Sequence, residues 1–144
     1  MNSISDNYNI MIYEDLTGKI LQACFEVSKE LGSGFLESVY EKSLLVALKQ
    51  KNLQVAAQVP LVVKFRDIIV GEFYADILVE GKVLIELKAV GGLANEHYAQ
   101  LLNYLKATDL EVGLLINFGN PKLEYRRFDN RSFQKINVQD LLSE

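Results

Sequence analysis

Three charged side chains interrupt two neighbouring apolar segments in the middle of the chain. Asp76 precedes the apolar run 77–79, and Glu86 and Lys88 end the run that starts at position 83. Burying an ionised carboxylate costs free energy unless a cation or hydrogen bonds compensate it. Two acids and a lysine among strand residues therefore indicate a cation-binding site, and a metal ion is the simplest occupant.

Strand geometry turns this spacing into a prediction about faces. Side chains alternate along a strand, so Glu86 and Lys88 point to one face and Leu87 to the other. If residues 80–82 form the loop of an antiparallel hairpin, Asp76 lies opposite Glu86, with Cβ atoms roughly 4.5–5.5 Å apart. A two-residue loop would shift the register and place Asp76 on the opposite face. The metal-site hypothesis therefore requires a loop of odd length, or a bulge that restores the phase.

These residue types suit a hard divalent cation. Mg²⁺ prefers carboxylate, carbonyl and water oxygens in octahedral geometry, and Asp76, Glu86 and the Leu87 carbonyl could supply part of that shell. Such an ion would polarise a phosphate and lower the pKa of a bound water, while Lys88 could orient that water or neutralise developing charge. The alternative is a solvent-exposed polar hairpin face with an ion pair between Glu86 and Lys88, and the spacing alone leaves both open.

Helical residues supply the other candidates. Glu37 falls in the first turn of a predicted helix, where the helix dipole alone explains an acid; functionally it could be a third metal-directed carboxylate or a base that positions water. His97, Gln100 and Tyr104 share one face of a later helix. Gln100 could bond a phosphate or a water, whereas a lone histidine such as His97 is more commonly satisfied by backbone. No Cys/His cluster indicates zinc, and no glycine-rich phosphate loop is present.

The elements that must position these residues follow from hydrophobic periodicity and turn signals. The residues before position 13 are expected to be loosely held, and the whole chain, 1–144, is expected to form one α/β domain. The predicted helices span 16 to Gly32, 36–51, 93–107 and 138–142. The predicted strands span 55–65 (or two strands broken near Pro60), 68–79, 83–88, 112–117, 123–128 and 133–137, with a turn at Arg66-Asp67.

Composition limits the possible functions. A formal net charge of −4 argues against non-specific coating of nucleic acid, because that affinity comes from Lys and Arg meeting phosphates. The segment 122–135 is nevertheless basic. The single cysteine, Cys24, cannot form an internal disulfide and falls in an apolar helical stripe. No secretory signal or apolar run of about 20 residues is visible, so a cytoplasmic location is expected.

Several motifs match one family in the same order. Residues 34–40 fit the pattern GxxExxY, and residues 86–89, 97–105 and 113–119 resemble the same family in the same order. From about position 20 to 128 the chain resembles the GxxExxY family, a branch of the PD-(D/E)XK nuclease superfamily. The resemblance implies a restriction-endonuclease-like core, in which helices flank a mixed central β-sheet and a divalent metal binds at the sheet.

The resemblance also implies roles for individual residues, and its one visible departure is Ala75, which stands where the superfamily pattern has Pro. The positions that match the family's site are the helical acid Glu37, the metal-binding Asp76, the Glu-x-Lys pair Glu86 and Lys88, and the helix motif Gln100 with Tyr104.

The expected function is Mg²⁺- or Mn²⁺-dependent hydrolysis of nucleic acid, with DNA the favoured substrate, by a metal-activated water. One alternative is a non-catalytic nuclease-fold module that binds partners within a DNA-processing or defence complex. Another is an enzyme that acts on a small phosphodiester or nucleotide. A homodimer or a larger complex is compatible with all three, and fold alone does not choose among them.

Overall fold

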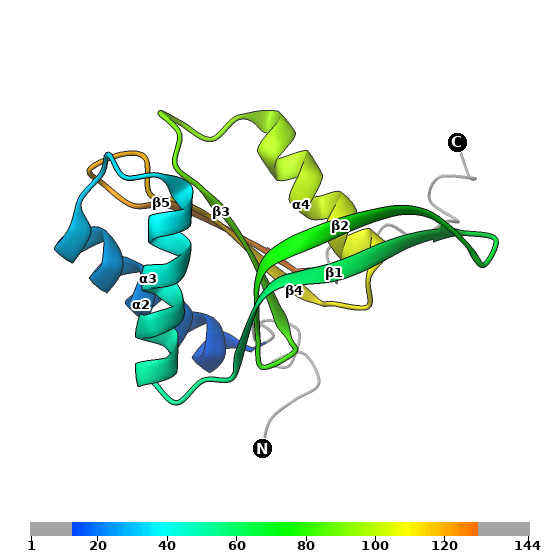
Figure 1. The fold of residues 1–144 in the computed structure, drawn as a ribbon, viewed down its shortest axis with the longest axis horizontal. Helices are drawn as coiled ribbons and strands as arrows, with labels where there is room; N and C mark the ends of the chain where they lie inside the picture. The colour runs from blue at the N-terminus through cyan, green and yellow to red at the C-terminus, as the bar shows by residue number, and fades with distance from the viewer. Residues whose placement is uncertain (1–12, 130–144) are drawn as a thin grey trace, which may run out of the picture.

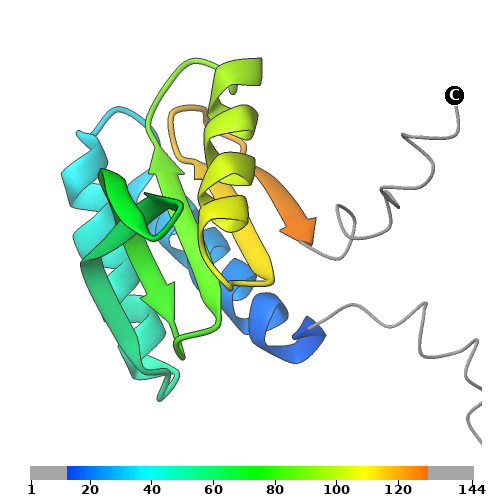
Figure 2. The same cartoon turned by 90° about the vertical axis from the view of Figure 1, so that its right-hand side faces the viewer.

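The computed structural model describes residues 13–129, which form a five-stranded mixed sheet with helices on both faces (Figures 1 and 2). The strand order is β1-β2-β3-β4-β5, and only β3 and β4 are parallel. The expected α/β fold class is confirmed, while the predicted elements at 133–137 and 138–142 lie outside the described residues. The elements are α2 (Glu14–Leu31), α3 (Glu37–Gln50), β1 (Val55–Phe65), β2 (Ile68–Val79), β3 (Val83–Lys88), α4 (Asn95–Ala107), β4 (Val112–Asn117) and β5 (Glu124–Asp129).

Helices α2 and α3 cover one face of the sheet with the apolar stripes that their sequences predict. Ile20 and Cys24 of α2 and Leu44 of α3 are fully buried in this core. At the start of α2 the Thr17 hydroxyl donates to the carbonyl of Tyr13 at 3.1 Å. The helix ends at Leu31, and Gly32 follows with a positive φ. Both predicted helices are thereby confirmed to within two residues at each end.

The β2–β3 hairpin has the register that the metal-site hypothesis requires. Ile77 pairs with Ile85, and Val79 pairs with Val83. The loop contains the three residues 80–82, and the Lys82 N–H donates to the Val79 carbonyl at 2.9 Å. The loop length is therefore odd, and Asp76 falls opposite Glu86 in this register.

The β1–β2 hairpin forms an arm that projects from the sheet (Figure 1). β1 is one strand, so the alternative of two strands broken at Pro60 is wrong. An edge strand tolerates proline because one side of its backbone needs no ladder partner, and β1 is the edge of this sheet. Arg66 and Asp67 make the predicted turn with φ values of 50° and 66°, as two-residue hairpin turns require.

Helix α4 crosses from β3 to β4 on the other face of the sheet, where Leu101 and Leu105 are buried against Leu84 and Leu115. A Cβ atom at Gly113 would lie 3.0 Å from a methyl group of Leu101, so the glycine lets α4 approach the sheet closely. α4 begins two residues later than predicted. β5 is confirmed as an edge strand antiparallel to β4. Within residues 13–129, no helix combines the length and apolar character needed to cross a bilayer.

Candidate metal centre

The two strand carboxylates lie where the ladder between β2 and β3 ends. The last paired residues are Ile77 and Ile85, so Asp76 and Glu86 come next on their strands. Their side chains replace ladder hydrogen bonds: the Leu87 N–H donates to Asp76 Oδ2 at 2.7 Å, and the Asp76 N–H donates to Glu86 Oε1 at 3.4 Å. The structure thus brings the predicted acid pair together, at a fork between two strands.

Burial makes this acid pair costly to ionise in the absence of a cation. Glu86 is only 6% exposed, and burial, followed by the charge of Asp76, raises the pKa of Glu86 to about 8. Burial also raises the pKa of Asp76, and the charge of Lys88 opposes the shift of both carboxyls. The alternative of a solvent-exposed polar hairpin face is therefore wrong for Glu86.

Glu37 is the first residue of α3, and its carboxyl interacts with the charges of the strand residues. Partial burial of its carboxyl raises its pKa, the charge of Asp76 raises it further, and the charge of Lys88 lowers it. The ionisation of Glu37 is therefore coupled to the charges of Asp76 and Lys88, as we expect for a third acidic residue of the site.

Tyr40 holds the segment that precedes Glu37. Its buried ring stacks on that of Phe118, with centroids 4.8 Å apart. Its hydroxyl donates to the Gly32 carbonyl at 2.6 Å and accepts the Phe35 N–H at 3.2 Å. One side chain therefore joins the turn between α2 and α3 to the chain that follows β4, and this fixes where α3 begins.

A Tyr40→Phe variant is expected to lose about 1–3 kcal/mol of unfolding free energy, because two backbone groups of the turn lose their partner. Chemical denaturation measures this loss. Mn²⁺ affinity is also expected to fall a few-fold, because Glu37 becomes less well placed. Tyr74→Phe is the matched control, since Tyr74 is 55% exposed; equal stability of the two variants would contradict the role given to Tyr40.

The polar face of α4 reaches the site through Tyr104. Its ring stacks on Phe73 of β2 with centroids 3.7 Å apart, and its hydroxyl accepts a hydrogen bond from Gln100 Nε2 at 2.6 Å. Its pKa is raised by burial first and then by the charges of Glu86 and Asp76. Gln100 is thus connected to the acid pair by way of Tyr104.

His97 has the backbone partner that its alternative interpretation predicts. Its Nδ1 accepts the Ala94 N–H at 3.0 Å at the start of α4. Its side chain also lines a surface hollow together with Gln100 and Tyr104. His97 therefore caps its own helix at the border of the site.

Sequence reasoning missed two residues that contact the acid pair or its surroundings. The Gln58 Nε2 atom of β1 donates to Glu41 Oε1 at 2.7 Å and lies 3.4 Å from Asp76 Oδ1. Glu41 follows Glu37 by one helical turn, a spacing that could have indicated a shared face. No local signal marks Gln58, because only the register of β1 on β2 brings it there.

Asn117 is a third residue that the sequence reasoning missed. It is fully buried, and its amide bonds both the N–H and the carbonyl of Val90 at 3.0 Å. Its Nδ2 also donates to Glu124 Oε1, which in turn accepts the Leu93 N–H. A Cβ atom at Gly119 would overlap the Val90 backbone. This network fixes the loop that leads from Lys88 to α4. The sequence signal for it is Asn117, a polar residue at the end of an otherwise apolar strand.

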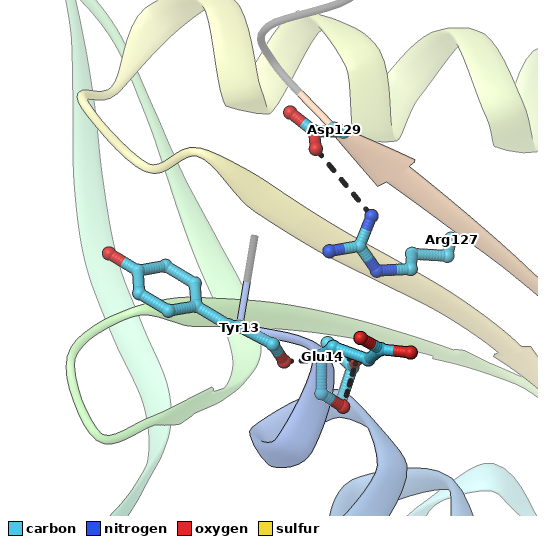
Figure 3. A network of polar contacts seen from close by, with 5 residues as sticks. Tyr13, Glu14, Arg127 and Asp129 are labelled. Atoms are coloured by element: carbon cyan, nitrogen blue, oxygen red, sulfur yellow. Dashed lines mark hydrogen bonds and ion pairs between the residues drawn. The ribbon is translucent and has the colours of Figure 1, made fainter. Parts of the chain in front are cut away.

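The predicted basic segment is partly described. Arg127 pairs with Asp129 at 3.6 Å (Figure 3), and the Arg126 guanidinium lies 5.7 Å from the centre of the Tyr98 ring. Arg131 and Lys135 lie outside the described residues. Arg126 and Arg127 are thus engaged with side chains of α4 and β5, respectively.

The donor set at the fork fits an ion that keeps part of its water shell. Among residues 13–129, no three His, Cys, Asp or Glu side chains come together as a complete ligand cluster. Asp76 and Glu86 instead offer two carboxylates whose mutual repulsion a cation would relieve. Mg²⁺ is commonly bound in this way, by one or two carboxylates and several waters.

Comparison with known proteins agrees with this fold. The model of the PD-(D/E)XK nuclease superfamily matches residues 14–128. A solved structure titled "Crystal structure of SSO0001" is similar, with a TM-score of 0.52 and 17% sequence identity, over 74% of this chain and 59% of that one. At this identity the likeness shows the fold alone, and this chain matches less than two thirds of the solved chain's length. A search of curated proteins found no significant match.

Proposed function

The chain belongs to the PD-(D/E)XK nuclease superfamily, and from this premise we propose that it hydrolyses phosphodiester bonds of nucleic acid, DNA foremost, with Mg²⁺ or Mn²⁺. Nucleases of this superfamily generally use divalent metal ions. Residues 34–40 support a finer assignment to the GxxExxY branch. The observation that carries the proposal is the pair Asp76 and Glu86 at the fork of β2 and β3, in electrostatic reach of Lys88.

Three groups of the fork would hold the ion. Asp76 and Glu86 offer carboxylate oxygens. In an extended strand the N–H and C=O of one residue face the same edge, so the Leu87 carbonyl faces the fork as its N–H does. The ion, when bound, supplies polarisation of the phosphate and acidification of a water.

The remaining site residues act around this ion in the proposed mechanism. Lys88 places a positive charge beside the carboxyls and stabilises negative charge that develops on the phosphate. Glu37 orients the attacking water from the start of α3. Gln100 lies on the α4 side of the site, where its contact with Tyr104 orients the side-chain amide. This amide positions the substrate by a hydrogen bond.

Replacing Lys88 by methionine tests its assigned role. Lys88→Met keeps most of the apolar stem and removes the charge, so cleavage is expected to fall about 10²-fold, as when one stabilising donor is lost from a reaction centre. Mn²⁺ affinity is expected to stay equal or increase, because a positive charge near the ion is gone. Single-turnover cleavage and Mn²⁺ titration measure the two effects.

Lys82→Met provides the matched control, since Lys82 lies in the exposed loop of the same hairpin, near the Tyr13 ring. It should cleave at the wild-type rate. If Lys88→Met did the same, Lys88 would have no part in the reaction.

The function is tested by incubating the protein with labelled single- and double-stranded DNA and RNA in Mg²⁺, Mn²⁺ or EDTA. We expect cleavage that requires the metal and that disappears in an Asp76→Asn preparation purified in parallel, which excludes a contaminating nuclease. A protein that binds Mn²⁺ and DNA but cleaves none of the substrates would instead favour the non-catalytic module. Cleavage that Asp76→Asn retains would refute the assigned site.

A further inference from the structure

We propose that Gln58 is a positioning residue of the metal centre, which holds Asp76 and Glu41 in fixed orientations through one side-chain amide. This inference rests on the proposed function, because it requires that a divalent cation binds at Asp76. It concerns a residue of the edge strand β1, which contains none of the residues that match the superfamily motif.

The sheet register places Gln58 at the site. Ala57 pairs with Ile77 and Val59 pairs with Ala75, so Gln58 lies across from Asp76. The ladder skips this one pair, and Gln58 has a φ of 51°. One irregularity in β1 therefore occurs at the residue that faces the metal-site aspartate, and the other, a register shift, lies between Val63 and Lys64.

The backbone of Gln58 is in a conformation that its residue type disfavours. Residues other than Gly, Asn and Asp rarely adopt a positive φ, because the Cβ atom is then too close to the backbone. Glycine would adopt it without this close contact. The four other non-glycine residues with positive φ between positions 52 and 80 lie at loops or turns, whereas Gln58 lies within a strand. The contacts of its side chain provide a reason for glutamine at this position.

Those contacts are made to two carboxylates of like charge. Gln58 Nε2 lies 2.7 Å from Glu41 Oε1 and 3.4 Å from Asp76 Oδ1. A primary amide has two N–H donors, so one nitrogen can serve both acids without adding a charge that would compete with a cation. Because Leu87 N–H holds the other Asp76 oxygen, both oxygens of Asp76 are oriented, and each keeps a lone pair for an ion.

A purely structural role would leave a different signature. Gln58 also connects β1 to α3 through Glu41, and that bond could serve only to hold the helix on the strand. In that case, loss of the side chain would lower stability and leave cation affinity unchanged. Partners that orient metal ligands are worth about 10–100-fold in metal affinity, so the two roles separate in a binding measurement.

The test is Mn²⁺ titration of the full chain, followed by electron paramagnetic resonance, together with chemical denaturation in EDTA. For Gln58→Gly we expect Mn²⁺ affinity to fall about 10-fold and stability in EDTA to stay unchanged or rise, because the strained backbone is relieved. Gln58→Asn keeps an amide that is too short to reach both acids, and it should lose affinity similarly.

Asp67→Gly is the matched control, since it relieves a φ of 66° in the turn of the β1–β2 arm, away from the site. It should bind Mn²⁺ as the wild type does. Wild-type affinity in Gln58→Gly, alongside weakened binding in Asp76→Asn, would overturn the role of Gln58 and leave the metal centre intact. Failure of the wild-type protein to bind Mn²⁺ would overturn both this inference and the proposed function.

Discussion

An Asp76→Asn variant is expected to lose on the order of 10³-fold in cleavage rate, because metal polarisation of a phosphate is worth several kcal/mol and each 1.4 kcal/mol is tenfold in rate. The substitution keeps an oxygen that can accept the Leu87 N–H, so the fork should retain its shape. Mn²⁺ binding should weaken in parallel. Single-turnover cleavage and Mn²⁺ titration of the same preparation measure both losses.

A stability measurement distinguishes the loss of cleavage in Asp76→Asn from a loss caused by unfolding. The charge of Asp76 raises the pKa of the buried Glu86 carboxyl, so its removal relieves repulsion, and we expect the unfolding free energy in EDTA to stay equal or rise. Asp67→Asn, in the turn of the β1–β2 arm, serves as the control and should cleave normally. An active Asp76→Asn variant would mean that the chemistry takes place elsewhere on the protein.

The second large effect is a loss of stability with rising pH in the metal-free protein. The pKa of Glu86 is raised from its ordinary value of 4.5 to about 8 in the folded state. Between these values the folded state binds the proton and the unfolded state does not, so stability falls as pH rises. At about 1.4 kcal/mol for each pKa unit, the loss between about pH 5 and pH 9 is roughly 4 kcal/mol.

Urea denaturation in EDTA at several pH values measures this slope. Glu86→Gln should remove most of it, whereas the exposed Glu111→Gln should retain it. In the wild-type protein, saturating Mg²⁺ or Mn²⁺ should reverse the sign of the slope of stability against pH, because the ions bind the deprotonated carboxylates. A slope of unchanged size in Glu86→Gln would contradict the raised pKa assigned to Glu86.

Local patterns predicted most of the elements that build the site. The apolar stripe of α2 and the continuous apolar run of β4 are signals of one helix and one buried strand, and both elements have the predicted bounds to within two residues. The alternation of Glu86 and Lys88 around Leu87 predicted a shared face. The requirement for an odd hairpin loop was likewise predictable, because side chains alternate with a period of two.

Contacts between distant segments were not predictable in this way. Gln58 meets Asp76 across the β1–β2 ladder, and Asn117 meets Val90 across 27 positions of the chain. The burial of Glu86 to 6% exposure depends on the segments that pack around the fork. None of these relations leaves a periodic pattern in a single segment.

The sequence by itself determined the acid pair, its lysine and the face that Glu86 shares with Lys88, since strand periodicity is a local property of the backbone. Only the tertiary structure decided that the two strands part at Asp76, that Glu37 and Tyr104 converge on the fork from opposite faces of the sheet, and that Gln58 orients toward it. The physical reason is that burial and like-charge repulsion depend on which segments pack together, and these effects raise the pKa of Glu86.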